Sequence, residues 1–369
     1  RQFQLRLKAT TRKQWLAAAT AVILGGVFDV VPTNPASHYL LDRRLYLQKI
    51  WRQGIGKPGP TAAAIPVVVI DQNTFQKVGA KKVPKRVSRQ TLAKLLQATP
   101  PVQVPKVAID VVLDENAPHI EELAEVIKNQ QRRLVFAGYF GPNVEAPSSG
   151  ATSKPQQVLK DAGLKAFNLS IGTIASGSEL QEAPLRLAEA ITSANFSAQL
   201  SDQPSRVMPA EAVLDWSLDW QSMIHRVEPD QLSTLNAPVL LIGSDGTLDP
   251  EKRDEFKRPG ALNPNLSSLW KGSRNKVPGV IVQAVLAQSL NLKHWLTPMS
   301  SAIAAGLTAA LAVALSALVD KRRKRLAICV GIAVVAIPLC MQIAISSTWL
   351  LPLVLPLGAL IVISFMRED

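Results

Sequence analysis

The chain of 369 residues has few of the residues that build disulfides and metal sites, with two cysteines and four histidines. Cys329 and Cys340 share one apolar run, where eleven residues of helix would separate them by about 16 Å, beyond the reach of a disulfide. The histidines are scattered, whereas zinc ligands are closely spaced. The sequence therefore predicts no metal site, and the cysteine-free segment 33–298 must depend on a hydrophobic core for its stability.

The common catalytic and nucleotide-binding motifs are also missing. The chain contains no GxSxG, GxGxxG, GxxxxGK[ST] or HExxH pattern. We therefore expect no enzyme activity in this chain and no cofactor. One alternative stays open, which is an external enzyme that binds a divalent ion or a substrate between Asp71 and Asp110.

Positive charge exceeds negative charge, with 41 Lys and Arg against 28 Asp and Glu, a net of +13. Segment 33–298 holds 30 Lys and Arg against 24 Asp and Glu. About half of the excess therefore lies beside apolar runs, at the N-terminus and in one cluster. The chain also lacks zinc-ligand spacing and a pattern of stacking aromatic residues, so we expect no nucleic-acid partner.

Four apolar runs are long enough to cross a bilayer, which takes about 20 residues of helix. The cluster between the second and third runs pins their turn in the cytoplasm, because short loops rich in Lys and Arg stay inside; it consists of Lys321, Arg322, Arg323, Lys324 and Arg325. Five basic residues precede the first run and give it the same orientation. The prediction is residues 1–14 cytoplasmic, 15–32 spanning, 33–298 outside, 299–319 spanning, 320–325 a cytoplasmic loop, 326–345 spanning, 348–365 spanning and 366–369 cytoplasmic.

Two questions about these runs stay open. The first run has a competing interpretation as a cleaved signal peptide, although no A-x-A cleavage site follows it. Prolines within the later runs, and small residues that allow close approach, favour packed helices and a homodimer, against the alternative of simple kinks. The prolines are Pro338, Pro352 and Pro356, and the small residues are Ala304, Gly306 and Ala310.

The outer segment alternates β-branched runs with helical patterns, which predicts an α/β domain with a mostly parallel sheet. Apolar spacing first predicts a helix near residues 41–51 that continues out of the membrane and is broken at 54–60 (GIGKPGP). The strands are predicted at residues 65–70, 106–112, 134–139 and 238–243. The later helices are predicted at 89–98, 120–130, 181–193 and 279–290, with a loop at 141–155.

Polar residues follow three of these strands: Asp71, Asp110, and the pair Ser244 and Asp245. The carboxyl ends of parallel strands meet in one crevice, where ligands bind in this architecture. Arg89 opens the helix after the first strand and could pair with one of the carboxylates. The alternative is that each Asp caps the segment that follows it. A shared site requires Asp71 and Asp110 to lie on the same face of the sheet.

The order of segments resembles the CHASE2 family of extracellular sensory domains. The resemblance covers nearly the whole chain, through LDRRLYLQ, IPVVVIDQNTFQKVG, RVSRQTLAKLL, VPKVAIDVVLDE, NAPVLLIGSDG, DEFKRP and VPGVIVQAVLAQSL, followed by three membrane runs. It adds Asp254, in DEFKRP, to the candidate ligand-binding residues. The chain departs from the family at Arg258, where Thr is common, and shows no DxDGxxR-like stretch between Phe167 and Arg206.

The resemblance implies a receptor module in the inner (plasma) membrane that detects an unknown extracytoplasmic ligand. It also implies a cytoplasmic output domain, which would precede residue 1 or belong to a partner protein. The expected partners are thus the lipid bilayer, a second copy of the chain and the output domain. The alternative is a structural or interaction subunit of a membrane assembly that uses the same domain for docking without sensing.

Overall fold

The computed structural model describes most of an α/β domain and one long apolar helix. The described residues are 35–79, 87–111, 119–130, 133–138, 158–159, 161–162, 166–168, 171–176, 179–184, 212–245, 255–262, 268–270, 275–300, 303, 306, 309–311 and 322–351. The predicted first span, the 141–155 loop, Asp254 and most of the second and fourth spans lie outside them.

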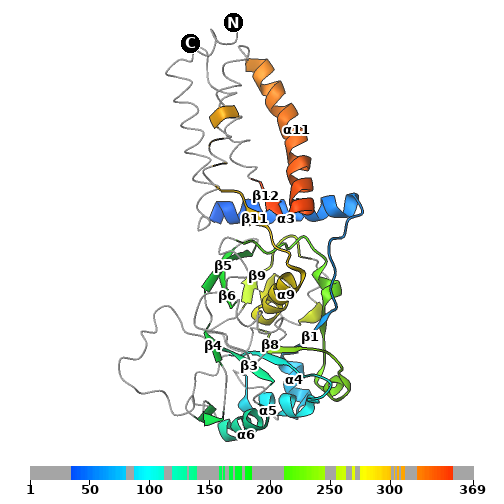
Figure 1. The fold of residues 1–369 in the computed structure, drawn as a ribbon, viewed down its shortest axis with the longest axis vertical. Coiled ribbons are helices and arrows are strands. Elements are labelled where there is room, and N and C mark those ends of the chain that lie inside the picture. The colour runs from blue at the N-terminus through cyan, green and yellow to red at the C-terminus, as the bar shows by residue number, and fades with distance from the viewer. Residues whose placement is uncertain are drawn as a thin grey trace, which may run out of the picture.

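A six-stranded parallel sheet forms the centre of the domain, in the order β4-β3-β2-β8-β1-β7 (Figure 1). Its strands are β1 Ile65–Ile70, β2 Val107–Asp110, β3 Leu134–Gly138, β4 Ala166–Asn168, β7 Ile224–Arg226 and β8 Leu240–Ser244. The central strands are short apolar runs that are buried on both faces, which is typical of a parallel sheet. The predicted mostly parallel α/β domain is confirmed.

Helices cover both faces of this sheet. On one face Val67, Val69 and Leu241 pack in the same core as α9 (Gly279–Leu292). On the other face Val68 and Ile70 pack in a second core with α5 (Arg89–Ala98) and α6 (Ile120–Gln130). This division follows from the strand geometry, because successive side chains point to opposite faces. A short helix, α4 (Gln72–Lys77), follows β1 directly.

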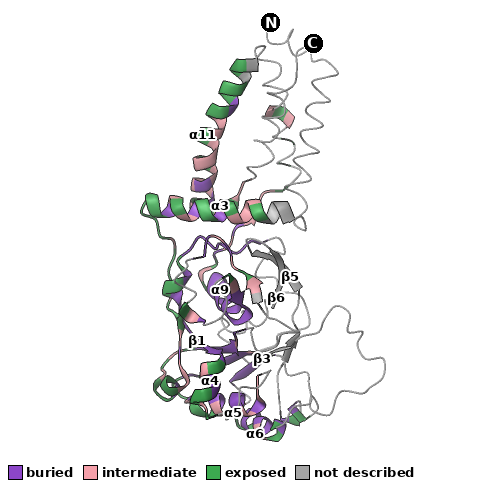
Figure 2. Cartoon of the chain, turned by 180° about the vertical axis from the view of Figure 1, so that it is seen from behind, coloured by how far each residue is buried: buried purple, intermediate pink, exposed green. Residues whose placement is uncertain are grey.

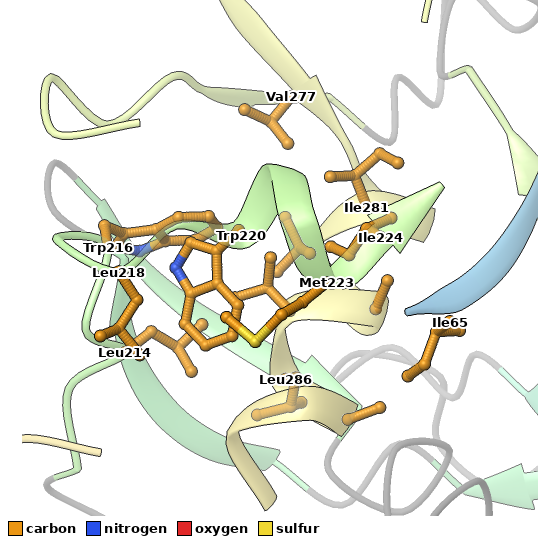
Figure 3. Close-up of a cluster of buried hydrophobic side chains, with 14 of the residues drawn as sticks. Ile65, Leu214, Trp216, Leu218, Trp220, Met223, Ile224, Val277, Ile281 and Leu286 are labelled. Atoms are coloured by element: carbon orange, nitrogen blue, oxygen red, sulfur yellow. The ribbon is translucent and has the colours of Figure 1, made fainter. Parts of the chain in front are cut away.

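The core around α9 is the larger of the two and contains a group of aromatic residues. Figure 3 shows Trp216, Trp220 and Met223 in one cluster with Ile281 and Leu286 of α9. The 3-10 helix η1 (Trp220–Met223) belongs to this region, whereas Leu232 of the second 3-10 helix, η2 (Pro229–Thr234), packs in the other core. The described residues also form three small two-stranded sheets: β5 Ile171–Ser176 with β6 Glu179–Pro184, β9 Glu255–Lys257 with β10 Lys276–Pro278, and β11 Thr297–Pro298 with β12 Trp349–Leu350.

Two further helices form the membrane side of the described structure. The first, α3 (Pro35–Gly54), lies across the top of the domain, and α11 (Arg322–Ser347) rises from it (Figure 1). Within the described residues, Leu326–Ser347 is the one helix long and apolar enough to cross a membrane, by length and composition. Its basic N-terminal end lies far from the domain.

Four details differ from the sequence prediction. The helix predicted at 181–193 is wrong at residues 181–184, which pair in the hairpin of β6 with β5. The helix α11 begins at Arg322, so the basic residues from there on form its first turn and not a loop. The run predicted as a span from residue 348 begins as strand β12. The helix predicted to continue out of the membrane instead lies across the end of α11 (Figure 1).

Gly243 of β8 tests the packing of α9 on the sheet. A methyl group there would lie 2.6 Å from the Cβ atom of Val280 in α9 and 3.2 Å from that of Asp110. We expect Gly243→Ala to lower the free energy of unfolding by about 1–3 kcal/mol through overpacking, measured by urea denaturation of the full chain in detergent. Gly54→Ala is the control, because no atom lies within 4 Å of its added methyl group. An equal loss in both variants would contradict this packing.

Candidate functional site

The carboxyl edge of the sheet carries a nearly buried ion pair between Asp71 and Arg226. Asp71 follows β1, and its Oδ2 lies 2.8 Å from Nη2 of Arg226, which ends β7. Its Oδ1 accepts a hydrogen bond of 2.8 Å from the backbone N–H of Thr74 and so caps α4. Asp71 therefore both caps α4 and forms an ion pair with Arg226.

The pKa of Asp71 reflects these contacts. Burial by itself raises the pKa of a carboxyl group, because it disfavours the charged form. The hydrogen bond from Thr74 and the charge and hydrogen bond of Arg226 outweigh burial, so the pKa of Asp71 lies below its ordinary value of 3.8. The Asp71 carboxylate is thus held in its charged form at neutral pH.

Arg226 extends the pair into a network that reaches the surface. Its Nε lies 2.7 Å from Oε1 of Glu228, and its Nη1 donates to the carbonyl oxygen of Leu269 at 3.2 Å. Lys77 then pairs with Glu228 at 3.2 Å and with the exposed Asp230 at 3.0 Å. Charges of both signs therefore alternate along this edge, each paired with the next.

Asp110 lies on the same face of the sheet as Asp71. It ends β2 in register with Gly243, and its Cβ faces the α9 side next to Val280. Asp71 continues the alternation of Val67 and Val69, which also face α9, since its backbone is extended. Asp71 and Asp110 therefore lie on one face of the sheet, as a shared site requires.

The other predicted site residues are placed differently. Ser244 ends β8 in register with Ile70, so strand alternation puts it on the face covered by α5 and α6. Asp245 is buried, and its N–H donates to the carbonyl oxygen of Ile70 at 3.1 Å. Arg89 is buried in the first turn of α5, and the partner that the structure gives to Asp71 is Arg226.

A second polar cluster, the Asp215 junction, lies on the membrane side of the domain. We define it as Gln48, Arg52, Asp215, Ser217 and His294. The Asp215 carboxylate is completely buried and lies 2.8 Å from Nη2 of Arg52 and 3.0 Å from Nε2 of His294. The backbone N–H of Ser217 donates to it at 3.1 Å, and Nε2 of Gln48 lies 3.4 Å away.

The junction joins three segments that are distant in sequence. Gln48 and Arg52 come from α3, Asp215 and Ser217 come from the segment before η1, and His294 follows α9. Burial raises the pKa of Asp215, but the hydrogen bond from His294 and the charge of Arg52 outweigh it and lower the pKa overall. A buried carboxylate of this kind requires its partners, so it fixes all three segments together.

Helix α9 runs between the two polar clusters. Val280 in its first turn contacts Gly243 at the carboxyl edge, and His294 follows shortly after its last residue. Its 14 residues span about 21 Å. Gln288 fixes the helix further by donating to the carbonyl oxygens of Ala63 at 2.7 Å and Met223 at 2.8 Å. The helix is therefore a buried rod between the edge and the junction.

Sequence reasoning missed Arg226 and the whole Asp215 junction. No strand was predicted at residues 224–226, because β7 has only three residues and two of them are polar. The run DWSLDW (residues 215–220) was the available signal for the junction, since each of its two acidic residues is followed directly by one of the seven tryptophans. No group of three or more His, Cys, Asp or Glu side chains in the described residues could hold a metal ion.

Comparison with known proteins gives one match. The family model described as "CHASE2 domain" matches residues 17–318, which is most of the chain. No match was found among the curated proteins or among the solved structures.

Asp71→Asn tests the ion pair at the carboxyl edge, because Asn retains the capping acceptor and loses the charge. We expect the variant to lose about 2 kcal/mol of unfolding free energy at pH 7, the range for a hydrogen bond between charged partners. The folded-state pKa of Asp71 is lowered, so this difference is full above pH 3.8 and disappears as the pH falls through the lowered pKa. Urea denaturation from pH 7 downwards measures it.

The matched control is Asp230→Asn, which removes an exposed partner of Lys77. Exposed ion pairs are screened by water and contribute little to stability, so this variant should unfold like the wild type. A difference between wild type and Asp71→Asn that is independent of pH would show that the charge of Asp71 does not contribute.

Proposed function

Because the chain belongs to the CHASE2 family of extracellular sensory domains, we propose that it is the sensory module of a membrane receptor. In this proposal the α/β domain lies outside the cell, is held in the inner (plasma) membrane by several spans, and passes a change of conformation to a cytoplasmic output domain. The module itself catalyses no reaction. The output belongs to another domain or to a partner protein, and the receptor acts as a homodimer.

The orientation of α11 supports an external domain. The first turn of α11 contains Arg322, Arg323, Lys324 and Arg325, and its other end contacts α3 beside the domain. The apolar part, Leu326–Ser347, is 22 residues long, or about 33 Å. Basic residues at the end of a span favour the cytoplasmic side, so the domain at the opposite end belongs outside.

The observation that best supports a signalling role is that α9 runs from the carboxyl edge of the sheet to the Asp215 junction. A ligand that binds near Asp71, Asp110 and Arg226 would contact the sheet where α9 begins. Any shift of α9 moves His294 relative to Asp215, and Asp215 also holds Arg52 of α3. A ligand changes this equilibrium only by its difference in affinity for the two arrangements.

Cysteine labelling tests the orientation. In a chain with Cys329 and Cys340 replaced by Ala, we expect Val102→Cys to react with a membrane-impermeant maleimide in intact spheroplasts, because Val102 is 85% exposed in the external domain. Lys324→Cys, exposed at the other end of α11, should react only after permeabilisation. The reverse order of reaction would exclude an external sensor.

Hydrogen exchange tests the coupling through α9. We expect Gly243→Ala, which pushes on Val280, to speed amide exchange in residues 45–52 of α3 in the full chain in nanodiscs. In a His294→Ala background the same substitution should add no further change, because the link to Asp215 is already lost. Leu123→Ala, in the core on the other face of the sheet, is the destabilised control and should leave α3 unchanged.

One result would contradict coupling through α9. If Leu123→Ala speeds exchange in α3 as much as Gly243→Ala does, the effect is general destabilisation. The domain would then fit a docking subunit of a membrane assembly better than a sensor.

A further inference from the structure

One side of helix α3 is buried against the domain. Leu45, Gln48 and Arg52 are at most 2% exposed and recur at spacings of three and four residues, which places them on one face. Asp42 lies beside this face and accepts a hydrogen bond of 2.6 Å from the backbone N–H of Gly260. This side of α3 supplies Gln48 and Arg52 to the Asp215 junction.

A second side of α3 contacts the membrane helix and the segment after it. The indole Nε1 of Trp51 donates to Oε1 of Gln342 in α11 at 3.2 Å. Arg44 donates to the carbonyl oxygen of Leu351, just beyond β12. Helix α3 therefore lies against the end of α11, between the domain and the span (Figure 1).

The third side of α3 is apolar and open. Tyr39, Tyr46, Leu47 and Ile50 are 42–53% exposed, and Figure 2 shows exposed residues along the length of the helix. Tyr46 lies seven residues after Tyr39, and Ile50 lies four residues after Tyr46 and three after Leu47. This spacing puts the four on one face, which we call the open face. The guanidinium of Arg43 lies 5.0 Å from the ring centre of Tyr39 on the same face.

The position of the open face relative to α11 indicates which environment covers it. Trp349 lies two residues after the end of α11 and is 50% exposed, which is typical of an aromatic residue where a span meets the headgroups. Above it α11 exposes the aliphatic side chains expected to face lipid tails, among them Val330, Val334, Val335 and Leu339. The open face thus lies where the hydrocarbon of the span ends.

We propose that the open face of α3 is embedded in the outer boundary between headgroups and acyl chains, so that the bilayer surface is itself a direct binding partner of the sensory domain. Amphipathic helices of this kind bury their apolar face about 5–10 Å into that boundary. Since the opposite side of α3 carries Gln48 and Arg52, a change in how the helix sits in lipid moves two partners of Asp215. The proposal rests on α11 crossing the membrane and not on detection of a soluble ligand.

Depth-dependent quenching in nanodiscs tests the proposal. The full chain, with Cys329 and Cys340 replaced by Ala, carries Leu47→Cys labelled with the fluorophore NBD, at one chain per phosphatidylcholine disc. We expect strong quenching by lipids with a spin label near the ester end of the acyl chain. Quenching should be weaker with the label near the methyl end, and iodide in the water should have little effect. Ile50→Glu should reduce the lipid quenching, because it places a charge in the open face.

Two labelled positions serve as controls. The probe at Val102→Cys should respond to iodide and to neither lipid, because Val102 is exposed on the domain. The probe at Val334→Cys should respond most to the label near the methyl end, because Val334 is exposed midway along the span. This second control reports whether α11 is in the bilayer, independently of α3.

Two outcomes overturn the proposal. If the Leu47 probe is quenched by iodide and by neither lipid while the Val334 probe still responds to lipid, α3 is not embedded although the span is, and the proposed receptor stands. If the Leu47 probe is shielded from iodide only in discs that hold two chains, a second copy covers the open face in place of lipid.

Discussion

A buried carboxylate must be matched by donors and positive charge, and Asp215 imposes this constraint on the whole molecule. Arg52 lies 163 residues before it in the chain and His294 lies 79 residues after it. Removing one partner of a buried ion pair costs about 3–5 kcal/mol, because the remaining charge stays desolvated. Helix α3, the segment of Asp215 and Ser217, and the end of α9 are therefore held in a single arrangement.

Apolar packing of α9 against the sheet stabilises the domain, and the buried charges fix which segments meet. The α9 helix is buried along nearly its whole length, and the strand faces of Val67, Val69 and Leu241 pack in its core. Gly243 allows α9 to approach the sheet closely where the predicted ligand-binding carboxylates lie. One helix thus contacts the edge of the sheet at its start and reaches the membrane side of the domain at its end.

The membrane side combines the same two kinds of interaction. One face of α3 holds the junction, and its open face of Tyr39, Tyr46, Leu47 and Ile50 is apolar. The contacts of Trp51 with Gln342 and of Arg44 with Leu351 place the helix against α11. The α/β domain and α11 therefore both contact the same 20-residue helix.

The sequence by itself determined the fold class, the main buried strands, the helices at 89–98, 120–130 and 279–290, and the family, because continuous apolar runs and helical spacing are local signals. It also identified Asp71 and Asp110 at strand ends. The tertiary structure alone decided that residues 181–184 form a hairpin strand, that Arg226 pairs with Asp71, and that Arg52, Asp215 and His294 meet. Those contacts join residues far apart in the chain, and hydrophobic periodicity contains no information about which distant charges will share a buried site.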